Sequence, residues 1–128
     1  MNINQKIISP TKNPPEVILD PKGIIKITGR LIPENAENFF NPIEDWLNEY
    51  FKNPADITTV EIRLEYINSA GTMYLLDIIH KITYIHLQKN TNKFIINWHY
   101  KDEDEDMLET GRFFSSDLNV PFNYIKII

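Results

Sequence analysis

The segment 60–85 constrains the fold most strongly, because the spacing of its apolar residues changes once and abruptly. Apolar and charged residues alternate from Val60 to Tyr66, which is the period of a half-buried strand. After Gly71 the apolar residues recur at helical spacing. These helical positions are Met73, Leu75, Leu76, Ile78, Ile79, Ile82 and Ile85. The sequence therefore predicts a strand that passes through a short turn directly into a helix.

The turn itself is Asn68-Ser69-Ala70-Gly71. Ser69 is placed to be the helix N-cap, with its oxygen accepting from the backbone N–H groups two or three residues on. The free amides and the positive end of the dipole at a helix N-terminus also suit an anion such as phosphate. Two interpretations of Ser69 stay open: a structural cap that contributes ~1 kcal/mol, or a site that carries phosphate.

Composition excludes several classes of function. The net charge of -5 leaves no basic surface for nucleic acid or for an anionic membrane. The absence of cysteine excludes disulfides, thiolate nucleophiles and Cys-type zinc sites. The first residues lack the apolar core of a signal peptide, and no apolar run is long enough to span a bilayer. We therefore expect a cytoplasmic protein that binds neither nucleic acid nor membranes.

The N-terminal half is expected to begin with strands. Residues 1–15 are polar and contain prolines, so we expect a flexible tail or an edge strand around Ile7-Ile8. Residues 16–20 and 24–30 are expected to form a β-hairpin, with Gly23 taking the positive φ that such a turn often requires.

An aromatic-rich helix is expected next, from about Phe39 to Lys52. It would begin at an Asn41 cap with Pro42 at its first position, or near Glu34 with a bend at Pro42. The face that we expect to pack in the core contains Phe39, Ile43, Trp46, Leu47 and Tyr50.

The C-terminal part continues the alternation of helices and strands. Residues 90–92 are expected to close the helix that follows the turn, and 93–100 to form a central strand with apolar side chains on both faces. A short helix is expected over 107–114, a loop over 115–117, and an edge strand over 121–127, because Pro121 cannot donate to a ladder. No internal repeat or linker divides the chain, so one α/β domain over 1–128 is expected.

Neither the acidic run nor the histidines indicate a metal site. Residues 102–106 have the Asp-x-Asp-x-Asp spacing of a calcium loop, but Met107 and Phe113 stand where an EF-hand needs glycine and glutamate. A solvated, helix-initiating charge run is expected instead. His80 and His86 are six residues apart, which does not place two ligands on one helix face. We expect no metal and no cofactor.

No catalytic motif is evident. Ser69 lacks the Gly-x-Ser-x-Gly elbow of a hydrolase, and there is no phosphate-binding loop of the Walker or dinucleotide type. A small enzyme that uses Asn68, Ser69 and nearby acids stays open as an alternative. It would require a deep pocket with a histidine within reach of Ser69.

The turn resembles the Asp-Ser-Ser-Gly turn of STAS domains and anti-sigma-factor antagonists, whose serine or threonine is phosphorylated. A longer pattern is similar to the SiaC family of bacterial regulatory phosphoproteins. The matching pieces follow the chain in order: Gly29-Arg30, Ile32 to Ala36, Phe40-x-Pro42, Asp45-Trp46-Leu47 with Tyr50, Leu64 to Ser69, Leu76-Asp77-Ile78, Asn97-Trp98, Asp104 to Met107, and Glu109-x-Gly111.

The resemblance implies a single STAS-like α/β domain with a mixed sheet of about five strands and helices mainly on one face. It also implies a non-enzymatic protein of a partner-switching module. In that module a kinase related to anti-sigma factors phosphorylates the turn and a PP2C-type phosphatase reverses it. The unmodified form binds and activates a diguanylate cyclase, which raises cyclic di-GMP and favours biofilm growth.

The family's phosphoacceptor is a threonine after the asparagine, and it falls on Ser69 in this chain. Thr72 is a second candidate acceptor, and the resemblance implies a partner-binding surface over Asn68, Ser69, Ala70, Gly71 and Thr72. The family continues with further serines and a lysine, whereas this chain has Ala70, Gly71, Thr72 and Met73.

Overall fold

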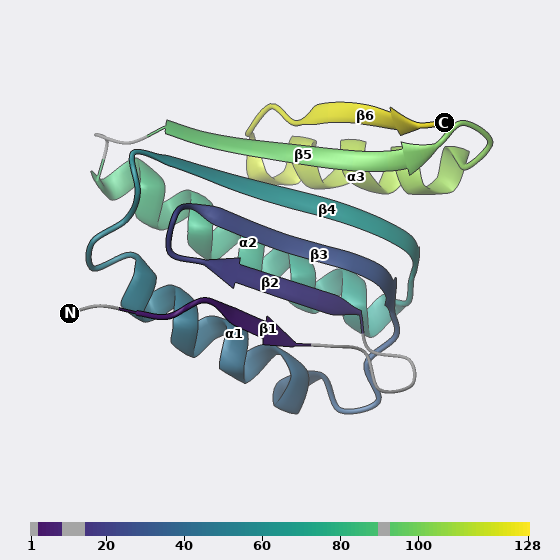
Figure 1. The fold of residues 1–128 in the computed structure, drawn as a ribbon. Helices are drawn as coiled ribbons and strands as arrows, with labels where there is room; N and C mark the ends of the chain where they lie inside the picture. The colour runs from purple at the N-terminus through teal and green to yellow at the C-terminus, as the bar shows by residue number, and fades with distance from the viewer. Residues whose placement is uncertain (1–2, 9–14, 90–92) are drawn as a thin grey trace.

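A six-stranded sheet runs through the molecule, with the strands in the order β1-β2-β3-β4-β5-β6 (Figure 1). The computed structural model describes residues 3–8, 15–89 and 93–128. The strands are β1 (Lys6–Ile8), β2 (Glu16–Asp20), β3 (Ile24–Leu31), β4 (Ile57–Ile67), β5 (Lys93–Lys101) and β6 (Asn123–Ile127). The first three pair antiparallel, and the pairs from β3 to β6 are parallel. The predicted mixed sheet is confirmed, and β1 makes it six strands rather than about five.

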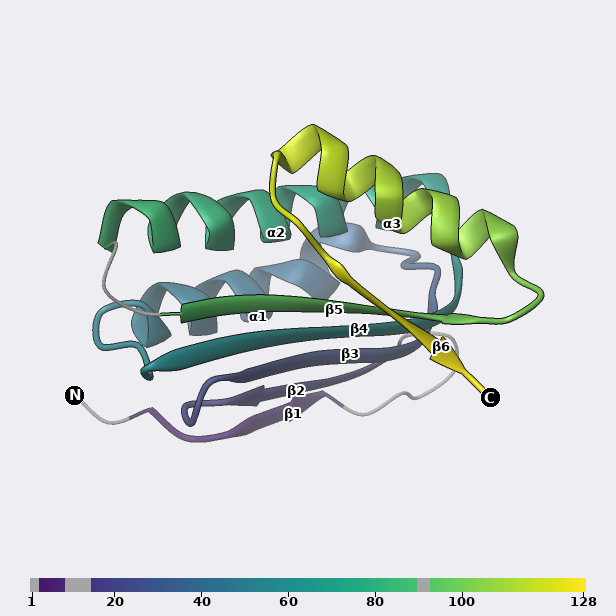
Figure 2. The same cartoon turned by 90° about the horizontal axis from the view of Figure 1, so that it is seen from above.

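Three helices cover one face of this sheet, and the other face carries none of the described helices (Figure 2). They are α1 (Ala36–Tyr50), α2 (Ser69–Lys89) and α3 (Glu105–Leu118). The core lies between the helices and the sheet. It is built from apolar side chains that alternate along β2 to β5 and face the helices. None of the described helices is both long and apolar enough to cross a bilayer.

The predicted hairpin of β2 and β3 is confirmed. Its turn is closed by a hydrogen bond from the Gly23 amide to the Asp20 carbonyl at 2.9 Å. Gly23 has φ 108°, and a Cβ there would lie 2.1 Å from the carbonyl oxygen of Ile57. Only glycine satisfies both constraints, because side chains disfavour this φ and none fits against that oxygen. Of the expected N-terminal tail or edge strand, Lys6–Ile8 is an edge strand, whereas residues 1–2 and 9–14 lie outside the described residues, as does the predicted helix end at 90–92.

The start of α1 corrects one of the two predicted positions. Asn35 is the N-cap and accepts from the Asn38 amide at 3.1 Å, so the prediction of a cap at Asn41 is wrong and the earlier start near Glu34 is confirmed. Pro42 lies inside the helix. The buried side chains are Phe40, Ile43, Trp46, Leu47 and Tyr50, so Phe40 takes the fully buried place expected for Phe39.

The core face of α2 differs from the prediction at its first turn. Leu75, Ile78, Ile79 and Ile82 are buried as expected. Met73 was expected in the same stripe, but its side chain is 67% exposed. Met73 precedes Leu75 by two residues, which is about 200° around the helix, so the two cannot face the same layer.

Helix α3 is longer than predicted. The expected loop over 115–117 is wrong, because the helix continues to Leu118 and ends at Asn119 with φ 55°. Phe114 is fully buried and Leu118 packs against the core, so the last helical turn is held by packing. The charge run at 102–106 begins the helix, as expected: Asp104 is the N-cap, and Glu105 and Asp106 lie in the first turn.

The two tryptophans fix different parts of the molecule. Trp46 of α1 donates its indole N–H to the carbonyl of Asn4 at 3.0 Å, which ties the N-terminal segment to the helix layer. Trp98 of β5 is fully buried and donates to the carbonyl of Met107 at 2.9 Å. Both polar atoms are thus satisfied by backbone, as buried indoles require.

Candidate functional site

The turn at 68–71 lies where one end of the sheet meets the starts of all three helices. The parallel strands β3, β4, β5 and β6 all point toward this end, and α1, α2 and α3 all begin there (Figure 1). Residue Asn68 is the only residue between β4 and α2. The strand–turn–helix arrangement expected from the sequence is therefore confirmed.

The N-cap of α2 is Asn68, so the prediction that Ser69 caps the helix is wrong. The Asn68 side-chain oxygen accepts from the Gly71 amide at 2.7 Å, and its carbonyl accepts from the Thr72 amide at 2.8 Å. The Asn68 amide donates to the Leu31 carbonyl at 3.1 Å, which holds this residue in line with the strands. The helix therefore begins at Ser69, whose side chain is exposed and has no hydrogen-bond partner within the described chain.

Gly71 lets the start of α2 approach β3 closely. A Cβ at this position would lie 2.7 Å from the carbonyl oxygen of Leu31 and 3.0 Å from its Cγ. The backbone oxygen cannot move without disturbing the pairing of β3 with β4. The inner side of the turn thus packs closely against Leu31 of β3, while Ser69 and Ala70 are exposed to solvent.

Thr72, the second candidate acceptor, is in a different environment. Its hydroxyl donates to the Asn68 carbonyl at 2.8 Å, and its side chain is only half-exposed. A kinase would have to break this hydrogen bond before transferring phosphate to the Thr72 oxygen. Of the two candidate hydroxyls, that of Ser69 is therefore the more accessible.

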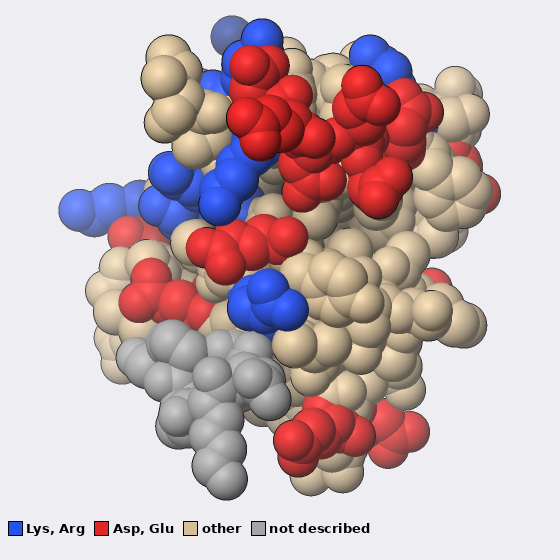
Figure 3. Space-filling model, turned by 90° about the vertical axis from the view of Figure 1, so that its right-hand side faces the viewer, with Lys and Arg blue, Asp and Glu red and all other residues tan. Residues whose placement is uncertain are grey.

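The helix starts at this end also differ in charge. The first turn of α1 contains Glu37, and that of α3 contains Glu105 and Asp106, whereas the first turn of α2 contains no acidic residue. Figure 3 shows this end of the molecule, with acidic side chains gathered in its upper part, an uncharged area beneath them on the right and further acidic side chains along the bottom. The positive end of the α2 dipole is thus not neutralised by side chains of its own first turn.

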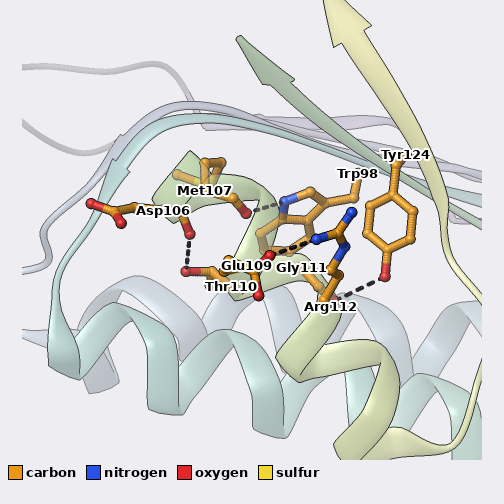
Figure 4. Close-up of polar contacts among 8 residues, drawn as sticks. All are labelled: Trp98, Asp106, Met107, Glu109, Thr110, Gly111, Arg112 and Tyr124. Atoms are coloured by element: carbon orange, nitrogen blue, oxygen red, sulfur yellow. Dashed lines mark hydrogen bonds and ion pairs between the residues drawn. The ribbon is translucent and has the colours of Figure 1, made fainter. Parts of the chain in front are cut away.

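Helix α3 is positioned beside α2 by its contact with β5 (Figure 4). The Trp98 indole donates to the Met107 carbonyl, and Gly111 lies directly against the indole ring. The Tyr124 hydroxyl of β6 donates weakly to the Gly111 carbonyl at 3.4 Å. Because these contacts involve the inner side of α3, its residues Asp106 and Glu109 remain exposed on the outer side.

A shallow hollow of about 440 Å³ lies between the first turn of α2 and the outer side of α3. We refer to it as the α2–α3 hollow, and it is lined by Ile67, Thr72, Asp106, Glu109, Thr110 and Phe113. Sequence reasoning missed it. The available signal was the pair Phe113-Phe114, because adjacent residues of a helix cannot both face the core.

The small-enzyme alternative gains no support from these groups. No histidine is among the described residues that line the hollow. His99 of β5 instead contacts Glu61 of the adjacent strand β4, with 2.7 Å between Nε2 and Oε1. Among the described residues, no group of three or more His, Asp or Glu side chains is arranged to hold a metal ion.

A family model described as SiaC family regulatory phosphoprotein matches residues 8–127. This chain belongs to the SiaC family. The resemblance expected from the sequence is thus confirmed, and the family consists of regulatory phosphoproteins. A curated relative, an uncharacterised protein of Pseudomonas aeruginosa, is 24% identical over 100 residues, which is 78% of each chain.

Solved structures of SiaC from Pseudomonas aeruginosa share the fold. One, in which SiaC is the activator bound to the diguanylate cyclase SiaD, matches with a TM-score of 0.85 at 23% identity over 95% of this chain and 99% of that one. Apo-SiaC matches with a TM-score of 0.80 at 20% identity, over 98% and 100% of the two chains. The expected fold class is confirmed by this similarity.

Proposed function

We propose that this protein is a phosphorylation-controlled switch: the unmodified form binds and activates a diguanylate cyclase, and phosphate on Ser69 blocks that binding. The observation that carries the proposal is the exposed, unpaired Ser69 hydroxyl at the first residue of α2. Membership of a family of regulatory phosphoproteins supports the switch, and the similar SiaC bound to a diguanylate cyclase supports the choice of partner.

Phosphorylation at this position is compatible with the fold. The Gly71 amide is capped by Asn68 rather than by Ser69, so modification of Ser69 breaks no hydrogen bond of the cap. A phosphate would add about -1.5 to -2 charges at a helix start, where the dipole favours an anion. The folded protein would therefore carry the modification without rearrangement.

A bound partner would not tolerate the same group. Met73 follows Ser69 by one helical turn and is 67% exposed, so the phosphate would project beside an apolar contact surface. A partner covering this surface would have to desolvate a dianion and make room for it. A loss of about 3 kcal/mol already corresponds to more than a hundredfold in affinity.

The enzymes of the switch are other proteins in this proposal. A serine/threonine kinase related to anti-sigma factors would modify Ser69, and a PP2C-type phosphatase would restore the hydroxyl. The protein would have no catalytic activity or cofactor of its own and would act in the cytoplasm. The surface around Asn68, Ser69, Ala70, Gly71 and Thr72 would contact its partners.

The test combines mass spectrometry with a cyclase assay. Protein isolated from its native cells should carry phosphate on Ser69. Purified diguanylate cyclases of the same organism should be activated by the wild type and by Ser69→Ala, but not by Ser69→Glu. Ser116→Glu is the matched control, because Ser116 is an exposed helical serine of α3. Equal activation by Ser69→Glu and Ser116→Glu would refute the switch.

A further inference from the structure

We infer that the α2–α3 hollow receives a lysine or arginine side chain of a protein partner, flanked there by an apolar side chain of the same segment. The inference rests on the proposed function, since it names the chemistry of the partner that meets the Ser69 end of the molecule. Three features of the hollow support it: its hydrogen-bonding character, its charge and its apolar border.

The polar groups that line the hollow can only accept hydrogen bonds. The Thr72 hydroxyl donates its proton to the Asn68 carbonyl at 2.8 Å, and the Thr110 hydroxyl donates to the Asp106 carbonyl at 2.9 Å. Both hydroxyl oxygens can therefore act only as hydrogen-bond acceptors toward a side chain that enters the hollow. The carboxylates of Asp106 and Glu109 are also acceptors. A group with several N–H donors and no acceptor fits this lining, which describes lysine and arginine.

The negative charge of the hollow also favours a lysine or arginine side chain. Asp106 has no ion-pair partner among the described residues. Glu109 accepts from Arg112 at 2.6 Å, but these side chains are 65% and 58% exposed, and such surface pairs are weak and easily exchanged. Among the residues that the structure describes, no cation lines the hollow. An incoming cation would thus find one free carboxylate and one that can change partner.

The apolar border accounts for the flanking side chain. Phe113, which lines the hollow, is 55% exposed, although its neighbour Phe114 is fully buried. Ile67 lines the same hollow and is half-buried. An aromatic ring at the edge of an acidic hollow can hold the alkyl stem of an arginine or stack on its guanidinium. Met73 lies at the same helix start and is also exposed.

The position of Ser69 connects the hollow to the switch. Ser69 precedes Thr72 by three residues, so their side chains are neighbours on the surface of α2. A phosphate on Ser69 would itself attract the cation, so in the proposed switch it blocks the partner by its bulk and by the cost of burying a dianion against the flanking apolar side chain.

The test uses the full-length, unmodified, isotope-labelled protein and two short synthetic peptides, one of alternating leucine and arginine and one of leucine and glutamate. The leucine–arginine peptide should shift the amide resonances of Thr72, Thr110 and Phe113, and the leucine–glutamate peptide should not. Shifts that centre elsewhere on the protein, or equal shifts with both peptides, would overturn the inference.

Variants then assign the contacts. Asp106→Asn combined with Glu109→Gln should lower the affinity for the leucine–arginine peptide by about tenfold. The matched control, Glu105→Gln with Asp117→Asn, removes two exposed carboxylates of the same helix outside the hollow and should leave the affinity unchanged. Equal losses in the two double variants would mean attraction by net charge alone and would overturn the inference.

The apolar border has a matched pair as well. Phe113→Ser should lower the affinity for the leucine–arginine peptide. Leu87→Ser should not lower it, although it also removes an exposed apolar side chain, 65% exposed and near the other end of α2.

Failure of the proposed function can be distinguished from failure of this inference. If Ser69→Glu still activates the cyclase while the peptide maps to the hollow, the switch fails and the site remains. If the peptide maps elsewhere while Ser69→Glu is inactive, the site fails alone.

Discussion

The indole of Trp98 occupies the space that a Cβ on Gly111 would need: that atom would lie 2.6 Å from Cδ1 and 2.7 Å from Nε1. The same indole donates to the Met107 carbonyl one turn earlier in α3. The helix therefore rests directly on a buried ring of β5, which sets its distance from the sheet. This contact also fixes the position of the outer side of α3, with Asp106 and Glu109, relative to α2 (Figure 4).

Gly111→Ala is expected to destabilise the protein in spite of the better helix propensity of alanine. Overpacking against a ring that cannot move costs about 1–3 kcal/mol. The higher helix propensity of alanine offsets about 1 kcal/mol of this cost. Because a Cβ would lie 2.6–2.8 Å from three ring atoms, we expect the upper end of that cost, and a net loss of about 2 kcal/mol should appear in urea unfolding followed by circular dichroism. Ser116→Ala, on the exposed side of the same helix, is the control and should not lower the stability. An unchanged midpoint for Gly111→Ala would contradict the close contact.

Asn68→Ala is expected to cost more stability than Ser69→Ala. The first change removes the N-cap of α2, which is typically worth about 1 kcal/mol. The second removes an exposed hydroxyl without a partner, and such surface changes stay within about 0.5 kcal/mol. Urea midpoints of the two variants give the comparison. The reverse order would show that Ser69 is the cap in solution.

Protein phosphorylated on Ser69 is expected to be as stable as the unmodified form. The cap of Asn68 on the Gly71 amide is unaffected, and the dipole interaction of an added anion contributes about 0.3–1 kcal/mol in favour of the folded state. Thermal unfolding of the two forms, separated by ion exchange, is the measurement. A marked drop in the melting temperature would mean that phosphate acts by unfolding α2 instead of by blocking a surface.

Tyr50→Phe is expected to destabilise the core by about 1–3 kcal/mol, because it leaves a buried hydroxyl without its partner. The Tyr50 hydroxyl lies 2.8 Å from the Thr58 Oγ1, which is buried between α1 and β4. The double variant Tyr50→Phe with Thr58→Val should recover part of the loss, since both hydroxyls are then replaced by apolar groups. The recovery is partial because the Ala55 amide, which donates to the Tyr50 hydroxyl at 3.1 Å, loses that acceptor in both variants. Chemical unfolding of the three proteins checks this, and a double variant no more stable than Tyr50→Phe alone contradicts it.

The sequence predicted the elements where period and turn chemistry agreed. Alternation along 60–66 and helical spacing from Leu75 onward led to β4 and the core face of α2, and both are present. Gly23 predicted the hairpin because a positive φ is a local requirement. The interpretation of Ser69 as a site that carries phosphate requires an exposed side chain, and this side chain is exposed.

Three of the errors share a physical origin, since each depended on a contact between distant segments. Asn68 and Ser69 are both good caps, and the choice between them is made by the hydrogen bond from the Asn68 amide to Leu31. The cap of α1 was placed at Asn41 because Asn-Pro is a strong local signal, yet burial of Phe40 requires the earlier start. The α2–α3 hollow depends on the packing of Gly111 on Trp98, whereas the local pair Phe113-Phe114 indicates only that one of the two rings faces outward.

The placement of the two indoles has a consequence for spectroscopy. Trp46 contacts the N-terminal segment through Asn4, toward the β1 edge of the sheet, whereas Trp98 of β5 contacts α3, toward the β6 edge. Single replacement of either one by phenylalanine leaves a protein whose tryptophan emission reports on one edge of the sheet. A stopped-flow trace of each variant would then show whether the two edges form together during refolding or one after the other.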